Sequence, residues 1–483
     1  MENKPYDVVI VGAGVVGASL AYSLGKTSPD RKILVIERDL REPDRIVGEL
    51  LQPGGCEKLK ELGLGECLEG IDAVEVHGYA VVMNNKQDAY PELQNKQENQ
   101  RLVYPQKDGH AMIGKSFHHG RFVQNLRKAA QSVSNVEMVQ GTVTQLIEER
   151  DTVVGVTWKD ADGQIKNSYG LLNIVCDGCT SNFRSKIGAG EPSSTSFFVG
   201  YVLEDCKLPF PGYGHVFLGT PGPVLGYQIG SNEIRVLIDV PKPLPNSANG
   251  ELAEFFLSVT AQQLPDEIRP AFIEAVKTKR PRSMANNRLH PQDSILKPGF
   301  VMVGDIWNMR HPLTGGGMTV AFNDVVLVRD ALRDLSDLSD RKKVMSKLHN
   351  TYVVGRRPFA STINILAGAL YNVFVASADP VLPVMRIACL DYFKLGGSAV
   401  SGPMSLLGGY SGKPYVLLYH FFCVALYGVW KLLKPFPSPS KLIQSYRLLA
   451  AASWIVIPLM RGEHMFTKFA RLLSILFFLN RPR

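Results

Sequence analysis

Cysteine is scarce in this chain. Its 483 residues include seven cysteines, which do not form the disulfide framework of a small secreted domain. Cys176 and Cys179 have CxxC spacing, but they lie within an Asp-Gly turn. We therefore interpret them as buried or bystander thiols, and we expect neither a redox dithiol nor a metal centre.

Acidic residues are almost absent from the C-terminal part. From Lys413 onward Glu463 is the only acid among ten basic residues, so this tail accounts for all of the formal net charge of +8, and more. The tail also holds apolar runs at 414–433, 448–460 and 472–479. Only the first is long enough to cross a bilayer, which takes about 20 residues, and Pro458 interrupts the second. Basic residues that flank apolar helices suit an anionic leaflet, so we expect a monotopic bundle in contact with membrane lipid. A buried C-terminal bundle with solvated lysines is the alternative.

The sequence contains no recognisable nucleic-acid-binding module, and we expect no secretory leader. Its C-terminal basic residues alternate with large apolar blocks and form no polar stripe, so we expect no nucleic acid partner. Only five residues precede Tyr6, too few for a signal peptide. We therefore expect the C-terminal helices to supply any membrane anchoring.

A glycine fingerprint near the N-terminus predicts dinucleotide binding. The apolar run at 6–11 is typical of a buried parallel strand, and Gly12, Gly14 and Gly17 follow it. A helix over 18–24 would then direct its N-terminal dipole at a pyrophosphate. The next strand ends on Glu37, twenty residues after Gly17, where an acid accepts hydrogen bonds from a ribose.

Later segments extend this prediction towards a flavin. Two apolar strands end at Asp177-Gly178 and at Gly304-Asp305, and Gly315-Gly316-Gly317 follows the second. Without a Cβ these glycines let the backbone lie against a ring, and a helix from about Met318 would aim its N-terminus at the N1/C2 side of that ring. Two phosphate-binding segments far apart indicate one long cofactor held at both ends, and FAD is the obvious candidate. The order of these segments resembles the FAD-dependent aromatic-hydroxylase class of monooxygenases.

Longer motifs resemble the squalene monooxygenase (squalene epoxidase) family. They lie at 37–55, 118–122, 308–318, 393–397, 402–403 and 420–422. The resemblance implies an FAD enzyme of sterol synthesis that inserts one oxygen atom of O2 into a terminal double bond of squalene. The reaction would pass through a C4a-hydroperoxyflavin to (3S)-2,3-oxidosqualene, with electrons from NADPH through a separate NADPH–cytochrome reductase. We expect an endoplasmic reticulum (microsomal) membrane location with the catalytic body facing the cytosol.

The cofactor contacts are spread over both halves of the chain. Some come from the glycine and strand-end patterns, and the others are carried over from the family resemblance. Guanidinium groups suit a diphosphate because they bind it bidentately. The predicted FAD contacts are Gly12, Gly14, Gly17, Glu37, Arg38, Arg45, Arg121, Val143, Asp305, Gly315, Gly316 and Met318.

The resemblance also implies a catalytic pair and an apolar tunnel. In the family a tyrosine at the position of Tyr79 pairs with the glutamine at Gln52 near the flavin, and a structural hydrogen bond is the alternative reading of that pair. A C30 hydrocarbon has no polar handle, so its tunnel must select by shape. Asp391, beside the expected pocket, is a departure from an apolar lining. The predicted substrate contacts are Tyr79, Phe393, Pro403, Leu406 and His420, each of which could instead be core.

We predict an α/β fold in four consecutive parts. A Rossmann-like FAD-binding domain of aromatic-hydroxylase type covers 1–190 and 291–350, an inserted antiparallel sheet covers 191–290, and a helical membrane-associated domain covers 351–483. The inserted sheet is predicted from alternating apolar strands at 197–203, 214–218, 224–229 and 233–238, with helices at 251–262 and 267–278. Residues 84–101 are polar and predict a surface excursion.

Two other function classes share this pattern. The first is another membrane flavoenzyme, an isoprenoid reductase or a hydroxylase, from which oxygen incorporation would distinguish an epoxidase. The second is an escort protein for prenylated GTPases, which need not retain the flavin contacts that are present here.

Overall fold

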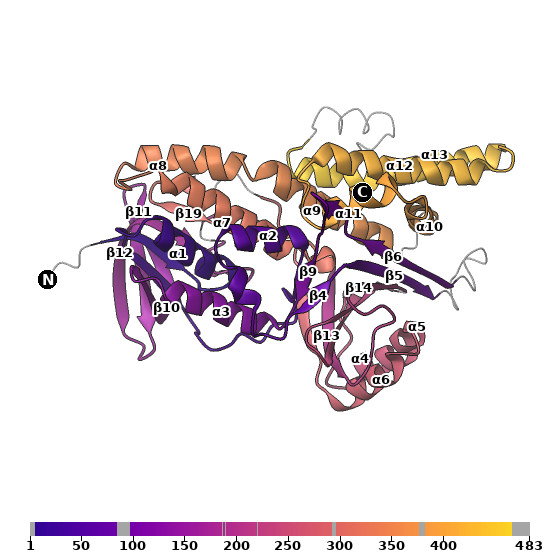
Figure 1. The fold of residues 1–483 in the computed structure, drawn as a ribbon, viewed down its shortest axis with the longest axis horizontal. Coiled ribbons are helices and arrows are strands. Elements are labelled where there is room, and N and C mark those ends of the chain that lie inside the picture. Colours follow the sequence, from indigo (N-terminus) through magenta and orange to yellow (C-terminus); the bar gives the residue numbers. More distant parts are fainter. Residues whose placement is uncertain are drawn as a thin grey trace.

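The computed structural model describes residues 5–84, 97–185, 187–188, 190–219, 221–291, 296–375 and 382–465. Figure 1 shows two large sheets side by side, with a group of C-terminal helices along the upper right. The fold is α/β with C-terminal helices, as the sequence predicts.

The first sheet is built on parallel strands β1 (Tyr6–Val11), β2 (Ile33–Glu37), β12 (Ile165–Val175) and β19 (Phe300–Met302), together with the first part of β10 (Val136–Glu149). The apolar residues of β1, β2, β19 and the end of β12 are buried almost throughout, because helices cover a parallel sheet of this kind. Helix α1 (Val15–Thr27) packs against both α3 (His119–Gln131) and α7 (Gly317–Arg333). Beyond this parallel region β10, β11 (Thr152–Asp160) and β12 form an antiparallel meander, and β18 (Leu296–Lys297) completes the edge.

The second sheet has the order β17-β13-β16-β15-β14-β5-β6. All four predicted strands are present, as β13 (Ser196–Glu204), β14 (Gly214–Leu218), β15 (Val224–Gln228) and β16 (Glu233–Pro241). On one face, α6 (Arg269–Thr278) and the helical run of α4 (Glu251–Phe255), η2 (Phe256–Thr260) and α5 (Ala261–Gln263) bury Phe256 and Phe272 beside Tyr201.

The second sheet differs from the prediction in two respects. It contains β5 (Gly78–Asn84) and β6 (Gln97–Val103), which come from the range assigned to the first domain, and β17 (Arg282–Ala285). It is also mixed and not purely antiparallel, since β14 pairs in parallel with β5. The reason is that β5 and β6 cover the open edge of β14, a long-range pairing that local alternation does not specify. The predicted excursion at 84–101 therefore includes strand residues at both ends, and 85–96 lie outside the described residues.

The C-terminal part is helical. It comprises α8 (Arg341–Lys347), η4 (Leu348–Val354), α9 (Arg357–Phe374), α10 (Leu382–Phe393), α11 (Ser398–Leu407), α12 (Pro414–Leu433) and α13 (Pro439–Gly462). Helices α12 and α13 form a hairpin that projects to the right in Figure 1. Within the described residues, these two helices are long and apolar enough to cross a membrane.

The expectation that the second apolar run is too short was wrong. Helix α13 has 24 residues and continues through Pro458. The helix begins at Pro439, before the apolar run, and its N-terminal half is more polar. The Ser438 side chain caps that end by accepting from the Lys441 backbone N–H. A proline deep in a packed helix removes one backbone hydrogen bond without necessarily ending the helix. The third apolar run, 472–479, lies outside the described residues.

Candidate functional site

The glycine turn after β1 is tightly packed on one side and open on the other. Gly12 has φ of +96°, and a Cβ there would lie 2.9 Å from the Cys176 carbonyl oxygen. A Cβ on Gly17 would lie 1.8 Å from the Gly12 carbonyl oxygen, whereas a Cβ on Gly14 would meet nothing within 4 Å. The open side adjoins the N-terminus of α1, so an anionic group can approach the backbone there.

Glu37, the last residue of β2, is held in place by the neighbouring glycine turn. Its carboxylate accepts a hydrogen bond of 2.6 Å from the Ala13 N–H. Arg127 of α3, which sequence reasoning missed, donates from Nε to the Ala13 carbonyl at 2.8 Å and lies 3.8 Å from Glu37. Burial lowers the pKa of Arg127, and the charge of Glu37 opposes that shift. Val143 is close along the sheet, three residues beyond the residue of β10 that pairs with Glu37.

Both strand-end aspartates follow neighbouring strands of the first sheet. Asp177 comes just after β12 and Asp305 just after β19, and those strands pair in parallel. Burial raises the pKa of Asp177, and within the described residues its Oδ1 is buried without a hydrogen-bond partner. Asp305 is exposed. The unpartnered carboxylate oxygen of Asp177 could accept from a ligand hydroxyl, and the open glycine turn could receive a phosphate. FAD has both kinds of group.

The three predicted arginines differ in their surroundings. Arg38 and Arg45 are exposed, and Arg45 Nη2 lies 3.4 Å from Cys179 Sγ, beside the turn that carries Asp177. Arg121 is exposed on the first turn of α3. Its charge is among the causes that lower the pKa of Asp72, after hydrogen bonds from Ser231. Cys176 is buried, which holds its pKa well above the usual range, as expected of an unreactive thiol.

The glycine-rich segment, 308–318, joins the first sheet to the rest of the molecule. Its 3-10 turn η3 (Pro312–Thr314) leads to Gly315, which has φ of +59°, and then to α7. Met318 is buried in the first turn of α7, and a Cβ on Gly316 would lie 2.7 Å from Ile363. A Cβ on Gly315 would lie 3.0 Å from Leu50 and 3.3 Å from Gln52 Nε2. The segment predicted to meet a flavin therefore touches the predicted catalytic pair.

Gln52 and Tyr79 form a buried hydrogen-bonded group with two further residues. Gln52 Nε2 donates to the Tyr79 hydroxyl at 2.5 Å and to the Thr314 carbonyl at 2.7 Å. Its Oε1 accepts from the hydroxyl of Tyr104, which sequence reasoning missed because a single tyrosine after a strand carries no pattern. Gln52 is 0% exposed. Burial raises the pKa of Tyr79 to about 12, so its hydroxyl stays protonated at neutral pH.

An apolar cluster continues from this group into the C-terminal helices. Tyr79, Tyr104 and Phe393 belong to the same cluster, which joins the inner face of the second sheet to α10, α11 and α12. Pro403 lies inside α11, whose end approaches the group, since the Gly408 carbonyl accepts from the Gly54 N–H at 2.7 Å.

Of the other predicted substrate residues, Leu406 lies apart from that cluster, whereas His420 contacts its member Tyr392. Leu406 packs in a separate cluster with residues of α9, α12 and α13. His420 Nδ1 is hydrogen-bonded to the Tyr392 hydroxyl at 2.9 Å, and its ring packs on Gly402. Asp391 is paired with Lys394 at 3.1 Å and with Lys431, so its charge is matched at the contact between α10 and α12.

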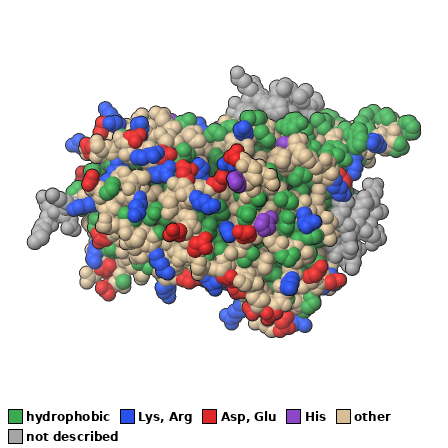
Figure 2. Space-filling view, in the orientation of Figure 1, with side chains coloured by type: hydrophobic (Ala, Val, Ile, Leu, Met, Phe, Trp, Pro, Cys, Tyr) green, Lys and Arg blue, Asp and Glu red, His purple; other side chains and the backbone are tan. Residues whose placement is uncertain are grey.

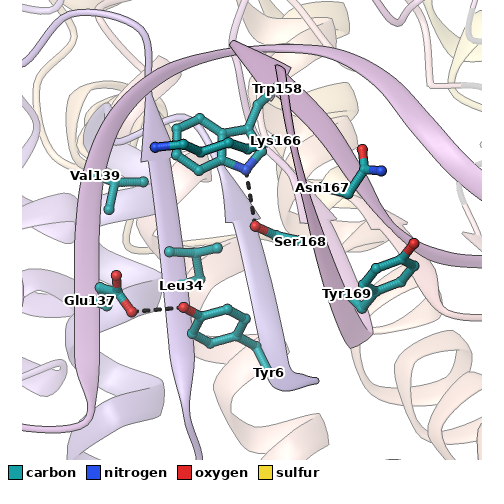
Figure 3. Close-up of a pocket in the computed structure, with 9 residues that line it drawn as sticks. All are labelled: Tyr6, Leu34, Glu137, Val139, Trp158, Lys166, Asn167, Ser168 and Tyr169. Carbon is teal, nitrogen blue, oxygen red and sulfur yellow. Dashed lines mark hydrogen bonds between the residues drawn. The ribbon is translucent and has the colours of Figure 1, made fainter. Parts of the chain in front are cut away.

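A cavity of about 400 Å³ lies elsewhere, between the parallel part of the first sheet and its meander. Figure 3 shows Tyr6 donating to Glu137 at 2.8 Å and Trp158 donating to Ser168 at 3.0 Å on its walls. None of the predicted site residues lines it. Most of its polar groups are paired, among them Lys166 with Asp160 at 2.7 Å, and we assign it no role.

The family model and the sequence relatives agree on one family, and the solved structures share the fold. The family model for squalene epoxidase matches residues 170–444. Squalene epoxidase 3 of Arabidopsis thaliana is 49% identical over 459 residues, covering 95% of this chain and 84% of that protein. The squalene monooxygenase of Mus musculus is 42% identical over 462 residues, covering 95% of this chain and 78% of that one. Among solved structures, p-nitrophenol 4-monooxygenase PnpA of Pseudomonas putida has a TM-score of 0.67 at 17% identity, covering 84% of this chain and 98% of that one.

Proposed function

Because the chain belongs to the squalene epoxidase family, its activity is the epoxidation of squalene with O2 in sterol biosynthesis, and we propose that the carboxyl edge of the first sheet holds FAD for this reaction. When bound, FAD supplies the activation of O2 and the oxygen transfer. The glycine turn and the N-terminus of α1 receive its pyrophosphate, with Glu37 and Val143 at the adenosine end. Arg38, Arg45 and Arg121 supply positive charge, Asp305 binds the ribityl side, and Gly315, Gly316 and Met318 lie against the ring.

The contact between the glycine-rich segment and Gln52 is the observation that carries this assignment. A Cβ on Gly315 would lie 3.3 Å from Gln52 Nε2, and Gln52 in turn holds Tyr79 at the margin of the apolar cluster. The redox side and the apolar side of the site therefore meet at one hydrogen-bonded group. We assign Gln52 and Tyr79 the role of fixing this junction and excluding water from it, since both are buried and neither is charged.

The substrate side is apolar and reaches the C-terminal helices. Tyr79 and Phe393 lie in one cluster, and Pro403, Leu406 and His420 lie on the neighbouring helices α11 and α12. Squalene has no polar group, so its terminal double bond must be placed by the shape of this lining. A path between the helices would admit squalene directly from lipid.

We also infer the cellular setting. Helices α12 and α13 expose large apolar side chains, and Figure 2 shows hydrophobic side chains gathered over this projecting end. That surface fits one leaflet of a membrane, with lysines and arginines at the headgroups. We propose the endoplasmic reticulum membrane, a body facing the cytosol, and electrons from NADPH through an NADPH–cytochrome reductase.

The test is mass analysis of squalene incubated with detergent-solubilised protein, FAD, NADPH and a microsomal reductase under labelled O2. We expect a product that is one labelled oxygen heavier, and we expect it to be absent with Asp305→Ala protein that no longer retains FAD. Unlabelled or absent product from a flavin-loaded protein would point to another isoprenoid flavoenzyme. Absence of both product and flavin would leave a lipid escort protein, the reading that family membership does not support.

A further inference from the structure

The only acidic residue in the basic C-terminal tail is buried. Glu463 stands among ten basic residues from Lys413 onward, and its side chain is 3% exposed. It occupies the C-cap of α13, where a carboxylate faces the negative end of the helix dipole. An acid in that place is unfavourable both for the helix and for desolvation, so its neighbours must compensate for it.

The neighbours of Glu463 are polar or cationic. Asn364 Nδ2 donates to Glu463 Oε1 at 2.9 Å, and His290 Nδ1 lies 3.6 Å from the same oxygen. Burial lowers the pKa of Arg288 and of Arg310; the charge of Glu463 opposes the first shift, and the charges of Asp305, Asp324 and, to a smaller extent, Glu463 oppose the second. The residues enclose a cavity of about 10 Å³, room for no more than one water molecule. Within the described residues Glu463 Oε2 has no hydrogen-bond partner.

From Asn364 the hydrogen bonds continue into the glycine-rich segment. Arg310 Nε donates to Asn364 Oδ1 at 2.6 Å, and its Nη2 donates to the Asn308 carbonyl at 3.1 Å. Arg310 Nη1 lies 3.4 Å from the carbonyl oxygen of Gly317, the first residue of α7. Three successive contacts, Glu463 to Asn364, Asn364 to Arg310 and Arg310 to Gly317, thus connect the end of the α12–α13 hairpin with the glycine backbone assigned to the flavin ring.

A second ion pair fixes the other side of this network. Arg356 forms a bidentate pair with Asp324 of α7 at 2.9 and 3.0 Å, and its Nη2 also donates to Asn308 Oδ1 at 3.1 Å. Both carboxylate oxygens of Asp324 therefore accept hydrogen bonds from Arg356. Glu463 is the remaining buried carboxylate that faces Arg310, and it comes from the helix farthest along the described chain.

We propose that Glu463 is a positioning residue for the flavin, acting through Asn364 and Arg310 on the backbone of the glycine-rich segment. The proposal rests on the assignment of FAD to that segment. It makes the α12–α13 hairpin a structural support of the cofactor site as well as a membrane contact. Loss of the carboxylate charge loosens Asn364, which holds Arg310, and the carbonyl of Gly317 is then fixed less firmly beside the ring.

The experiment compares FAD dissociation constants of full-length wild type, Glu463→Gln and Ile443→Ser in detergent, by titration of flavin fluorescence. Ile443 is 55% exposed on the same helix, so its substitution is a matched control. We expect Glu463→Gln to weaken FAD binding roughly tenfold, the scale on which a charge-assisted hydrogen bond exceeds the neutral one that glutamine can form, and Ile443→Ser to leave it unchanged. Melting of the FAD-free proteins is measured in parallel. A lower melting temperature with unchanged FAD affinity would overturn the proposal in favour of a merely structural acid.

A double-mutant cycle with Arg310→Lys tests the path. If Glu463 acts through Arg310, the double variant binds FAD little more weakly than the weaker single variant. Independent effects that multiply would overturn the path, and an effect of Glu463→Gln on FAD affinity below twofold would overturn the role itself. Failure of wild-type protein to bind FAD at all would instead contradict the proposed cofactor, so the two failures are distinguishable.

Discussion

Gln52 is the residue on which the buried polar group depends. It is the shared partner of the Tyr79 and Tyr104 hydroxyls and also bonds the Thr314 carbonyl. Tyr79→Phe removes one of these partners and should cost about 1 kcal/mol of unfolding free energy. Gln52→Leu leaves the Tyr104 hydroxyl without this partner and leaves the Tyr79 hydroxyl only its bond of 3.2 Å to the Thr314 carbonyl, so we expect a larger cost of roughly 2 kcal/mol. Urea unfolding of the detergent-solubilised proteins measures both, and equal costs would contradict the central place of Gln52.

His119 makes the stability of the fold depend on pH. Burial, together with the charge of Arg45, lowers the pKa of His119 to about 4. Its unfolded value is about 6.5, so the unfolded state binds the proton first as the pH falls. The stability from neutral His119 is complete above about pH 6.5 and is lost towards pH 4, at about 1.4 kcal/mol per pH unit.

The measurement is unfolding free energy at pH 7.5 and at pH 5. Wild type should lose about 2 kcal/mol more than His119→Asn over this interval, since the variant has no imidazole to protonate. His110→Asn, at an exposed histidine, is the control and should follow wild type. Parallel loss in wild type and His119→Asn would show that the buried imidazole does not set the acid sensitivity.

At the scale of elements, the α12–α13 hairpin carries the proposed lipid contact. Trp430 and Phe436 are 49% and 77% exposed. Replacing both with serine should lower binding to vesicles with anionic lipid at least tenfold, because each aromatic side chain would bury its area in the interface. Flotation of protein with vesicles measures this, and Tyr169→Ser, at an exposed aromatic residue on β12, is the control. Undiminished flotation of the double variant would place the membrane contact elsewhere.

Elements with a regular apolar pattern could be predicted, and elements fixed by distant partners could not. Strands β13 to β16 follow from alternation, and β1, α1 and β2 follow from the glycine fingerprint. The pairing of β5 with β14 has no local signal, since the two strands are about 130 residues apart. The length of α13 was underestimated because a count of apolar residues omits its polar, capped N-terminal half.

At the scale of the molecule, the candidate site lies where several strands end, and the sequence predicts this convergence because it places the glycine turn and the strand-end acids directly after those strands. Residues after β1, β2, β12 and β19 converge because parallel strands share one carboxyl edge. Arg127, Tyr104 and Arg310 were missed, since a lone arginine or tyrosine resembles a surface residue until its partners are known. The roles of the FAD contacts, of Tyr79 and Gln52, and of the substrate residues remain predictions.

The parallel pairing of β5 with β14 has a consequence for synthesis of the protein on the ribosome. Residues 78–84 emerge well before residues 214–218, their partners in the second sheet. At ordinary elongation rates this delay is on the order of ten seconds. During it β5 is paired on one side only, with β6, and the first sheet also waits for β19. The nascent chain therefore presents one unpaired apolar edge, the side of β5 that later meets β14, for far longer than a hairpin needs to form, and we expect that edge to need shielding until β14 has been synthesised.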